Sequence, residues 1–161
     1  MKEYNRKEAL RYAKEWAYKR NPKYYNFDRV GGDCTSFVSQ CIYAGAGIMN
    51  YSPYGWYYRS GNDKSASWSG VEYLHKFLVN NKQKGPYGRD ANLNELEKGD
   101  LIQLSFDGNI FGHTLIITDI SHGKILIASH TDDSYNRDLQ TYNYRKARGI
   151  KIEGVRLSTK K

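Results

Sequence analysis

The sequence predicts an α+β domain in which helices come first and an antiparallel sheet follows. Over roughly the first 80 residues, apolar side chains recur at helical spacing, and from residue 99 they recur at every second position. A chain of 161 residues is long enough for one hydrophobic core and leaves little for a second. We therefore treat residues 1–161 as a single domain with N-terminal helices packed on an antiparallel sheet.

Three helices are predicted in the first half of the chain. The first lies within residues 1–20 and ends at Asn21-Pro22, and its apolar face comprises Ala9, Tyr12, Ala13, Trp16 and Ala17. The second begins near Asp33-Cys34 and stops near Gly45 and Gly47. A long loop over residues 46–67 follows. Ser69 and Glu72 have the spacing of a capping box, which predicts a third helix with an apolar stripe of Val71, Leu74, His75 and Leu78.

Four strands are predicted in the second half: Leu101–Phe106, His113–Ile120, Lys124–His130 and Ile150–Leu157. The apolar phase of the last strand reverses at Gly154, which indicates a β-bulge there. His122-Gly123 has the form of a two-residue hairpin turn. With that turn, paired residue numbers sum to 245, so His113 is expected opposite Asp132 and His130 opposite Leu115.

The net charge of +8 is concentrated at the two ends of the chain, while residues 30–136 are net acidic. A nucleic-acid groove needs basic and aromatic side chains interleaved along one face, so we do not expect nucleic acid as a partner. Basic ends fit attraction to an anionic polymer such as a bacterial cell wall, or simply solubility. No stretch is long and apolar enough to span a membrane, and no signal peptide opens the chain.

Cys34 has the setting of a nucleophile, and Cys41 does not. Cys34 opens a helix directly after Gly31-Gly32, where free backbone N–H groups and the helix dipole favour the thiolate and can hold an oxyanion. Asp33 stands at the N-cap position. Cys41 lies on the apolar stripe of the same helix and is interpreted as a small core residue. Seven residues apart on one helix, the two thiols are expected to stay free, since their Cα atoms would be about 10 Å apart.

A thiol nucleophile needs a base, and two of the four histidines suit that role. His75 lies on an apolar stripe and is interpreted as a core histidine, and His122 lies in the hairpin turn. In the predicted register His113, His130 and Asp132 share one face, with His130 diagonal to His113. A register slip of one residue would break this arrangement.

These segments together resemble the papain-like cysteine hydrolases of bacterial cell walls, the NlpC/P60 and CHAP groups. The closest resemblance is to the "putative amidase domain" family of Gram-positive bacteria. The matching stretches are Gly32–Cys41, Trp68 opening a helix, Gly99–Gln103, Gly112–Ile117 and His130–Asp133, which together cover roughly residues 5–140. The resemblance implies a papain-like, NlpC/P60-like fold.

The resemblance also implies roles for particular residues. Cys34 would be the nucleophile, His113 the base and His130 the third residue that orients His113, with Asp132 as the competing choice. Backbone N–H groups at the helix start, beside Asp33 and Cys34, would hold the oxyanion, and no cofactor is required. Trp68 and four loop tyrosines, Tyr51, Tyr54, Tyr57 and Tyr58, are candidate walls of a substrate groove, although core or loop packing is the favoured role for any single one of them.

The implied substrate is an amide bond in peptidoglycan, cleaved by a monomer that is secreted or wall-associated as part of a longer or trimmed protein. Two alternatives remain open at this point: a tyrosine-rich wall-binding module that has lost catalysis, and acyl transfer to an amine instead of water. A metal site formed by His113, His130 and Asp132 is disfavoured, because no metal-binding pair such as HExxH or closely spaced cysteines accompanies it.

Overall fold

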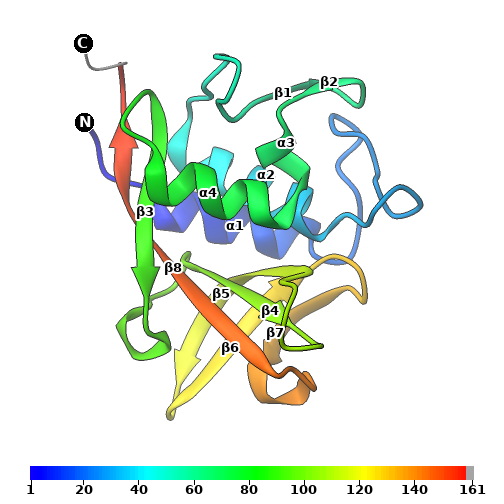
Figure 1. Cartoon of the computed structure of the whole chain (residues 1–161). Coiled ribbons are helices and arrows are strands. Elements are labelled where there is room, and N and C mark those ends of the chain that lie inside the picture. The colour runs from blue at the N-terminus through cyan, green and yellow to red at the C-terminus, as the bar shows by residue number, and fades with distance from the viewer. Residues whose placement is uncertain (159–161) are drawn as a thin grey trace.

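The computed structural model describes residues 1–158, which fold into a group of helices packed against a sheet (Figure 1). The last three residues of the predicted domain, 159–161, lie outside the described residues. The helices are α1 (Arg6–Trp16), α2 (Cys34–Ala46), α3 (Ala66–Ser69) and α4 (Val71–Asn80), with short 3-10 helices η1 (Leu93–Glu95) and η2 (Leu139–Thr141). The strands are β1 (Tyr58–Ser60), β2 (Asp63–Lys64), β3 (Gly85–Ala91), β4 (Leu101–Ser105), β5 (His113–Ser121), β6 (Lys124–Ser129), β7 (Ser134–Asp138) and β8 (Lys146–Arg156).

The main sheet has the strand order β3-β8-β4-β5-β6-β7, and every neighbouring pair is antiparallel. This confirms the α+β class, and the four predicted strands correspond to β4, β5, β6 and β8. The bulge expected near Gly154 is confirmed, because the pairing of β3 with β8 skips Glu153. The two edge strands β3 and β7 were not predicted from the sequence.

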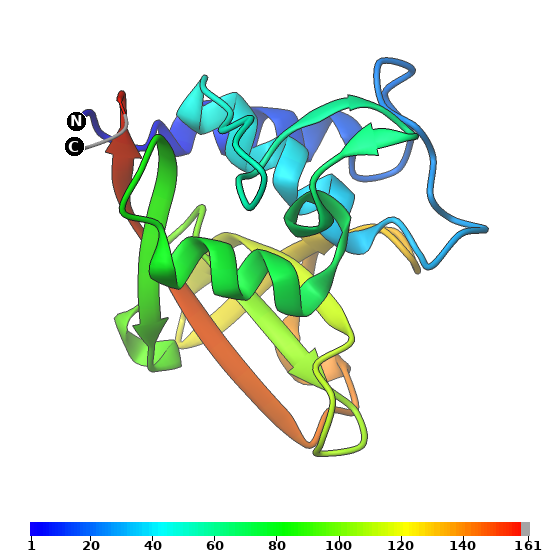
Figure 2. The same cartoon turned by 45° about the horizontal axis from the view of Figure 1, so that its top comes forward.

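The two central strands are buried on both faces because apolar layers lie on each side of the sheet. Leu101 and Ile116 point toward the helices, where they join the larger core. Ile102, Leu104 and Ile117 point to the opposite face and form a second core closed by η1 and η2. Burying a side chain of this size contributes roughly 1.5–3 kcal/mol. Figure 2 shows the helices gathered on one side of the sheet.

The helix α2 lies between α1 and the sheet, which is why nearly all of its residues are buried. The predicted apolar face of α1 is confirmed by Ala9, Ala13 and Ala17, which are fully buried. Gly47 ends α2 in a left-handed conformation with φ of 72°, and its N–H donates to the carbonyl of Tyr43. A glycine suits this position because it reaches positive φ without steric cost.

The capping box predicted for the third helix is wrong. Ser69 ends the short helix α3, and α4 begins only after Gly70, whose backbone is extended. The Glu72 carboxylate instead accepts a hydrogen bond from Arg148 at 2.7 Å. The sequence has the spacing of a capping box, but Gly70 separates α3 from α4. Ser69 and Glu72 therefore belong to different helices and cannot cap one together.

The N-terminal segment is fastened to the end of β8. Lys2 and Val155 exchange two backbone hydrogen bonds of 2.9 and 3.0 Å. The buried Asp100 carboxylate accepts from the Arg6 guanidinium at 2.8 Å and from the Ile152 N–H at 2.9 Å.

None of the helices within residues 1–158 combines the length and the apolar character needed to cross a membrane.

Candidate active site

Cys34 is the first residue of α2 and is reached through a tight turn. Gly31 and Gly32 adopt φ values of 84° and 93°, a region that residues with a side chain rarely enter. A side chain on Gly31 would meet nothing within 4 Å, so its backbone conformation alone calls for glycine there. The glycine pair thus turns the chain sharply into the helix and leaves Cys34 at the first turn, as predicted.

The Cys34 thiol is largely buried, with 7% of the residue exposed. Burial raises the pKa of this thiol, while hydrogen bonding from the Thr114 backbone N–H and from Thr35 acts in the opposite direction. The Asp33 carboxylate also raises the thiol pKa. The expectation of a thiolate at rest is therefore wrong, because loss of solvent outweighs the stabilisation offered at the helix start.

Two threonines join α2, which begins with the predicted nucleophile, to β5, which begins with the predicted base. The hydroxyls of Thr35 and Thr114 are hydrogen bonded at 2.9 Å, and both residues are fully buried. From the neighbouring strand β4, the side-chain amide of Gln103 donates to the Thr114 hydroxyl at 3.3 Å. Thr35 follows Cys34 and Thr114 follows His113, so this contact holds the segments that carry the predicted nucleophile and base against each other.

His113, the first residue of β5, is buried and lies between aromatic rings. The ring centroids of Phe106 and Tyr142 lie 6.3 and 5.7 Å from the imidazole. Burial and, to a smaller extent, the nearby Arg137 cation lower the pKa of His113 from 6.5 to about 4, against an opposing effect of Asp132. The imidazole is therefore neutral near neutral pH, as a general base must be.

Ser129, at the end of β6, orients His113. Its hydroxyl lies 3.0 Å from Nε2 of His113 and donates to its own neighbour, the His130 carbonyl, at 2.7 Å. Because that single hydroxyl proton is used on the carbonyl, the hydroxyl oxygen accepts from the His113 Nε2–H. The proton on Nε2 leaves Nδ1 of His113 with the free lone pair, so Nδ1 is the nitrogen that can act as a base.

A bulge at Thr118 explains why Ser129 occupies the place predicted for His130. Next to the turn the pairing follows the predicted sum of 245, with Ser121 opposite Lys124. Beyond Thr118 the sum becomes 244, with Ile116 opposite Ala128. In a sheet a shift of one residue moves every following side chain to the other face. The predicted contact between His113 and His130 is therefore wrong, and Ser129 makes it instead.

His130 lies on the helix side of the sheet and contacts two other segments. Its Nδ1 is 2.6 Å from the Asp33 carboxylate, and its Nε2 is 2.7 Å from the carbonyl of Trp16. The ring also stacks on Phe37 with the centroids 4.0 Å apart. His130 is thus held against the beginning of α2 and the end of α1, one residue away from the group that orients His113.

Residues 3–153 match the family described as "Putative amidase domain". The chain belongs to this family. It is also 34% identical over 140 residues to the uncharacterized protein YhbB of Bacillus subtilis. That match covers 84% of this chain but 44% of YhbB, so the chain spans less than half the length of this relative. No solved structure matches.

Asp132, the competing third residue, does not contact His113 in this amidase-family chain. Its side chain is 83% exposed and pairs with the Arg137 guanidinium at 3.1 Å. Thr131 and Asp132 both have positive φ, at 64° and 68°, so the turn after His130 holds two residues in an uncommon conformation. That turn directs Asp132 outward, and the hypothesis that it orients the base is wrong.

Asp33 occupies the N-cap position of α2, but its side chain does not cap the helix. The carboxylate accepts instead from the Phe27 N–H at 2.9 Å and faces His130. The first backbone hydrogen bond of the helix runs from the Phe37 N–H to the Asp33 carbonyl. Since no side chain caps this turn, N–H groups of the first turn of α2 stay available to hold an oxyanion.

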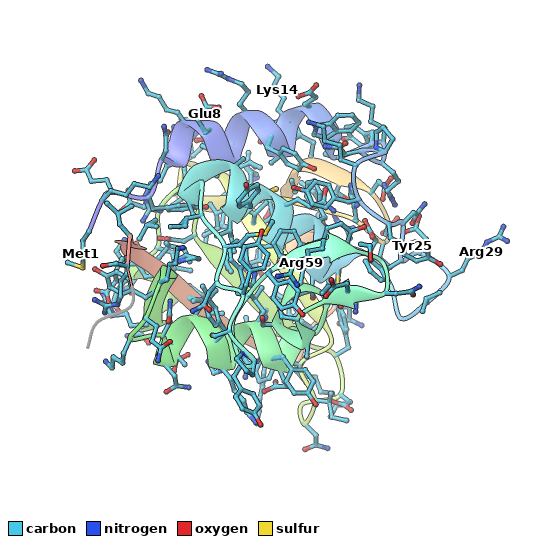
Figure 3. All side chains as sticks on the ribbon, turned by 90° about the horizontal axis from the view of Figure 1, so that it is seen from above. Met1, Glu8, Lys14, Tyr25, Arg29 and Arg59 are labelled. Atoms are coloured by element: carbon cyan, nitrogen blue, oxygen red, sulfur yellow. The ribbon has the colours of Figure 1, made fainter. Side chains whose placement is uncertain are left out.

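The aromatic residues predicted to line a substrate groove have different positions. Trp68 is fully buried and packs against the rings of Tyr24 and Trp56, so it is a core residue. The Tyr57 ring lies beneath the Arg59 guanidinium, and the Tyr57 hydroxyl donates to Asp63. Arg59 lies near the centre of the view in Figure 3. Tyr54 is 96% exposed and lines a hollow of about 930 Å³ beside α4, whose lining includes neither Cys34 nor His113.

The side chains of the disfavoured metal site do not converge. His113 faces Ser129, His130 faces Asp33, and Asp132 faces Arg137. Within residues 1–158 no group of three or more such side chains could hold a metal ion. Cys41 is fully buried among apolar residues, as predicted, and both cysteines are free thiols.

Ser129 was missed because its position depends on the bulge at Thr118, and no glycine or proline marks that bulge in the sequence.

Proposed function

We propose that this chain hydrolyses an amide bond with Cys34 as nucleophile and His113 as general base. The observation that carries the proposal is the buried contact between Thr35 and Thr114, which joins the residues following Cys34 and His113. A thiol at the first turn of a helix, a neutral imidazole beside it and a group that orients the imidazole form a complete set for acyl transfer. Membership of the amidase-domain family supports the same reaction class.

The reaction begins from a neutral thiol and a neutral imidazole. The pKa of Cys34 is raised by burial and that of His113 is lowered to about 4, so a resting thiolate–imidazolium pair is disfavoured. The Nδ1 atom of His113 therefore takes the thiol proton as the sulfur attacks the carbonyl carbon. The carbonyl oxygen becomes an oxyanion, held by the N–H groups at the start of α2.

The tetrahedral intermediate then collapses with His113 as acid. The imidazolium gives its proton to the amide nitrogen, the C–N bond breaks, and a thioester on Cys34 remains. Water attacks the thioester while His113 accepts a proton from it, and the acid product leaves with the thiol restored. Throughout, Ser129 keeps the proton on Nε2 of His113, so Nδ1 is the atom that gains and loses protons.

The proposed substrate is a peptide bond of peptidoglycan, in a stem peptide or a cross-bridge. A net charge of +8, concentrated at the two ends of the chain, supports attraction to an anionic cell-wall polymer. Lys14 and Arg29 point outward in Figure 3, from α1 and from the loop that leads into Cys34. This substrate implies that the protein acts outside the cytoplasm, at the cell wall.

The test is mass spectrometry of soluble fragments released from purified bacterial walls. We expect the wild type and Cys41→Ala to release peptides with one newly formed carboxyl end, and Cys34→Ala and His113→Ala to release none. Cys41→Ala is the matched control because it removes the other thiol, which lies in the core. Fragment release that survives Cys34→Ala would refute the proposal.

The same experiment separates the proposal from its rivals. Binding to walls with no fragments from any variant would indicate a binding module instead of an enzyme. Products in which the new carbonyl is joined to an added amine, at the expense of the free acid, would indicate acyl transfer.

A further inference from the structure

We propose that His130 is a positioning residue, held as a doubly protonated imidazolium that pairs with Asp33. The pair holds the segment that carries Cys34 against the segment that carries Ser129. This inference rests on the proposed function, since it assigns a role in preparing Cys34 and Ser129. It differs from that function in being testable without any substrate. Its basis is the set of partners around the His130 ring.

Both ring nitrogens of His130 face groups that accept hydrogen bonds. Nε2 lies 2.7 Å from the Trp16 carbonyl, which has no proton to give, so Nε2 carries a hydrogen. Nδ1 lies 2.6 Å from the Asp33 carboxylate, a separation typical of a charge-assisted hydrogen bond. A ring that donates from both nitrogens carries a positive charge.

The surroundings of Asp33 show that it is the anion of the pair. Its other oxygen accepts from the Phe27 N–H at 2.9 Å, and the Arg20 guanidinium lies 3.7 Å away. Both of these neighbours are donors, and one of them is a cation. They stabilise a carboxylate over a carboxylic acid at Asp33, and so favour the shared proton on Nδ1 of His130.

Helix ends on both sides favour the same charges. Trp16 is the last residue of α1, so its carbonyl belongs to the negative end of that helix, where a cation is favoured. Asp33 stands at the positive end of α2, where an anion is favoured. The imidazolium therefore lies between two negative groups, and the carboxylate lies against a positive one.

The other charged groups around His130 are paired among themselves. Arg20 binds Asp133 at 2.9 Å and Asp28 at 3.0 Å. Asp132, in the turn after His130, points away toward Arg137. One face of the ring is covered by an apolar group, since Phe37 stacks on it. Among the described residues, Asp33 is thus the anion in direct contact with the His130 ring.

The pair acts on the active site from two directions. Through Asp33 it holds the residue before Cys34, and it offsets a carboxylate that otherwise opposes ionisation of the thiol. The backbone carbonyl of His130 accepts a hydrogen bond from the Ser129 hydroxyl and so sets the hydroxyl that orients His113. His130 therefore connects the start of α2, through its side chain, with Ser129, through its backbone.

The first experiment observes the charge directly. Long-range ¹H–¹⁵N correlation near neutral pH, with His130→Gln to assign the signals, should show both nitrogens of His130 protonated. In Asp33→Asn, one nitrogen should lose its proton because its anion is gone. A wild-type ring with one unprotonated nitrogen would overturn the proposal.

The second experiment measures the consequence at Cys34, in a Cys41→Ala background that leaves one thiol. His130→Gln leaves Asp33 unpaired, and we expect iodoacetamide to alkylate Cys34 at least about fivefold more slowly. Adding Asp33→Asn to that variant should restore most of the rate, because the unpaired carboxylate is removed. A double variant no faster than His130→Gln would show mere loss of packing and would refute the role.

The two proposals fail separately. The alkylation rates and the nitrogen signals require no substrate. A chain that releases no wall fragments would therefore refute the hydrolase proposal and leave the proposed pair of His130 and Asp33 untouched. Where His130→Gln does not fold, the wild-type and Asp33→Asn signals still decide the matter.

Discussion

The acid sensitivity of this fold should be traceable to His113. Burial, together with the Arg137 cation, lowers the pKa of this imidazole from 6.5 to about 4. The unfolded chain has neither burial nor a fixed neighbouring cation, so there the imidazole titrates at its ordinary value. Between those two pKa values the unfolded state binds a proton that the folded state does not. The free energy of unfolding therefore falls as the pH falls through this window.

The size of the effect follows from the two pKa values. A difference between 6.5 and about 4 corresponds to about 3 kcal/mol, at 1.36 kcal/mol for each factor of ten in proton affinity. This stability is fully present above the ordinary pKa and is lost by the time the pH reaches the folded one. For a domain of this size that is a large part of the total free energy of unfolding.

The assay is urea unfolding of the wild type and His113→Gln at several pH values across this window. Glutamine keeps an N–H for the Ser129 hydroxyl but cannot titrate, and the other three histidines are common to both proteins. The difference in free energy of unfolding between the two should shrink by about 3 kcal/mol from neutral pH to pH 4. Two curves that stay parallel would show that His113 is not held neutral by the fold.

Three further predictions concern the active site. Ser129→Ala removes the hydrogen bond to His113, worth about 1 kcal/mol, so kcat should fall roughly fivefold with little change in KM in steady-state assays on wall peptides; an unchanged kcat would contradict it. Arg137→Gln removes the nearby cation and should raise the pKa of His113, moving the acidic limb of kcat/KM to higher pH, and an unmoved limb would rule this out. Iodoacetamide should modify Cys34, which is 7% exposed, ahead of the fully buried Cys41, as peptide mass spectrometry can check, and equal rates would count against it.

Much of the fold could be predicted because its central elements have strong apolar periodicity. The helices α1 and α2 and the strands β4, β5, β6 and β8 each place apolar side chains at a regular spacing. The edge strands lack that signal. The strand β3 begins Gly-Pro-Tyr-Gly, and β7 is Ser-Tyr-Asn-Arg-Asp. An edge strand pairs with a neighbour on one side only and makes few core contacts. Its side chains need not alternate between apolar and polar, so the sequence pattern does not reveal it.

The site was predicted as far as the residues depended on local signals. Cys34 at a helix start and His113 at a strand start are local features, and the structure brings their neighbours together. The third residue depended on register over the whole hairpin. The turn at His122 was right, but the bulge at Thr118 shifts the pairing by one and exchanges the faces of Ser129 and His130. A bulge formed by an ordinary β-branched residue leaves no mark in a single sequence.

The low pKa of His113 has opposite consequences for the two halves of the proposed reaction. As a base it is weak, and the thiol it must deprotonate has a raised pKa, so the attack step is made harder. As an acid the imidazolium is strong, so protonation of the leaving nitrogen is made easier. Ser129 fits this balance, because a neutral hydroxyl orients the ring without stabilising its charge, whereas a carboxylate in that place would do so. An amide nitrogen leaves only when protonated, and a thiolate or an activated alkoxide leaves without a proton. The arrangement therefore favours amides over activated esters and thioesters among the bonds that Cys34 could attack.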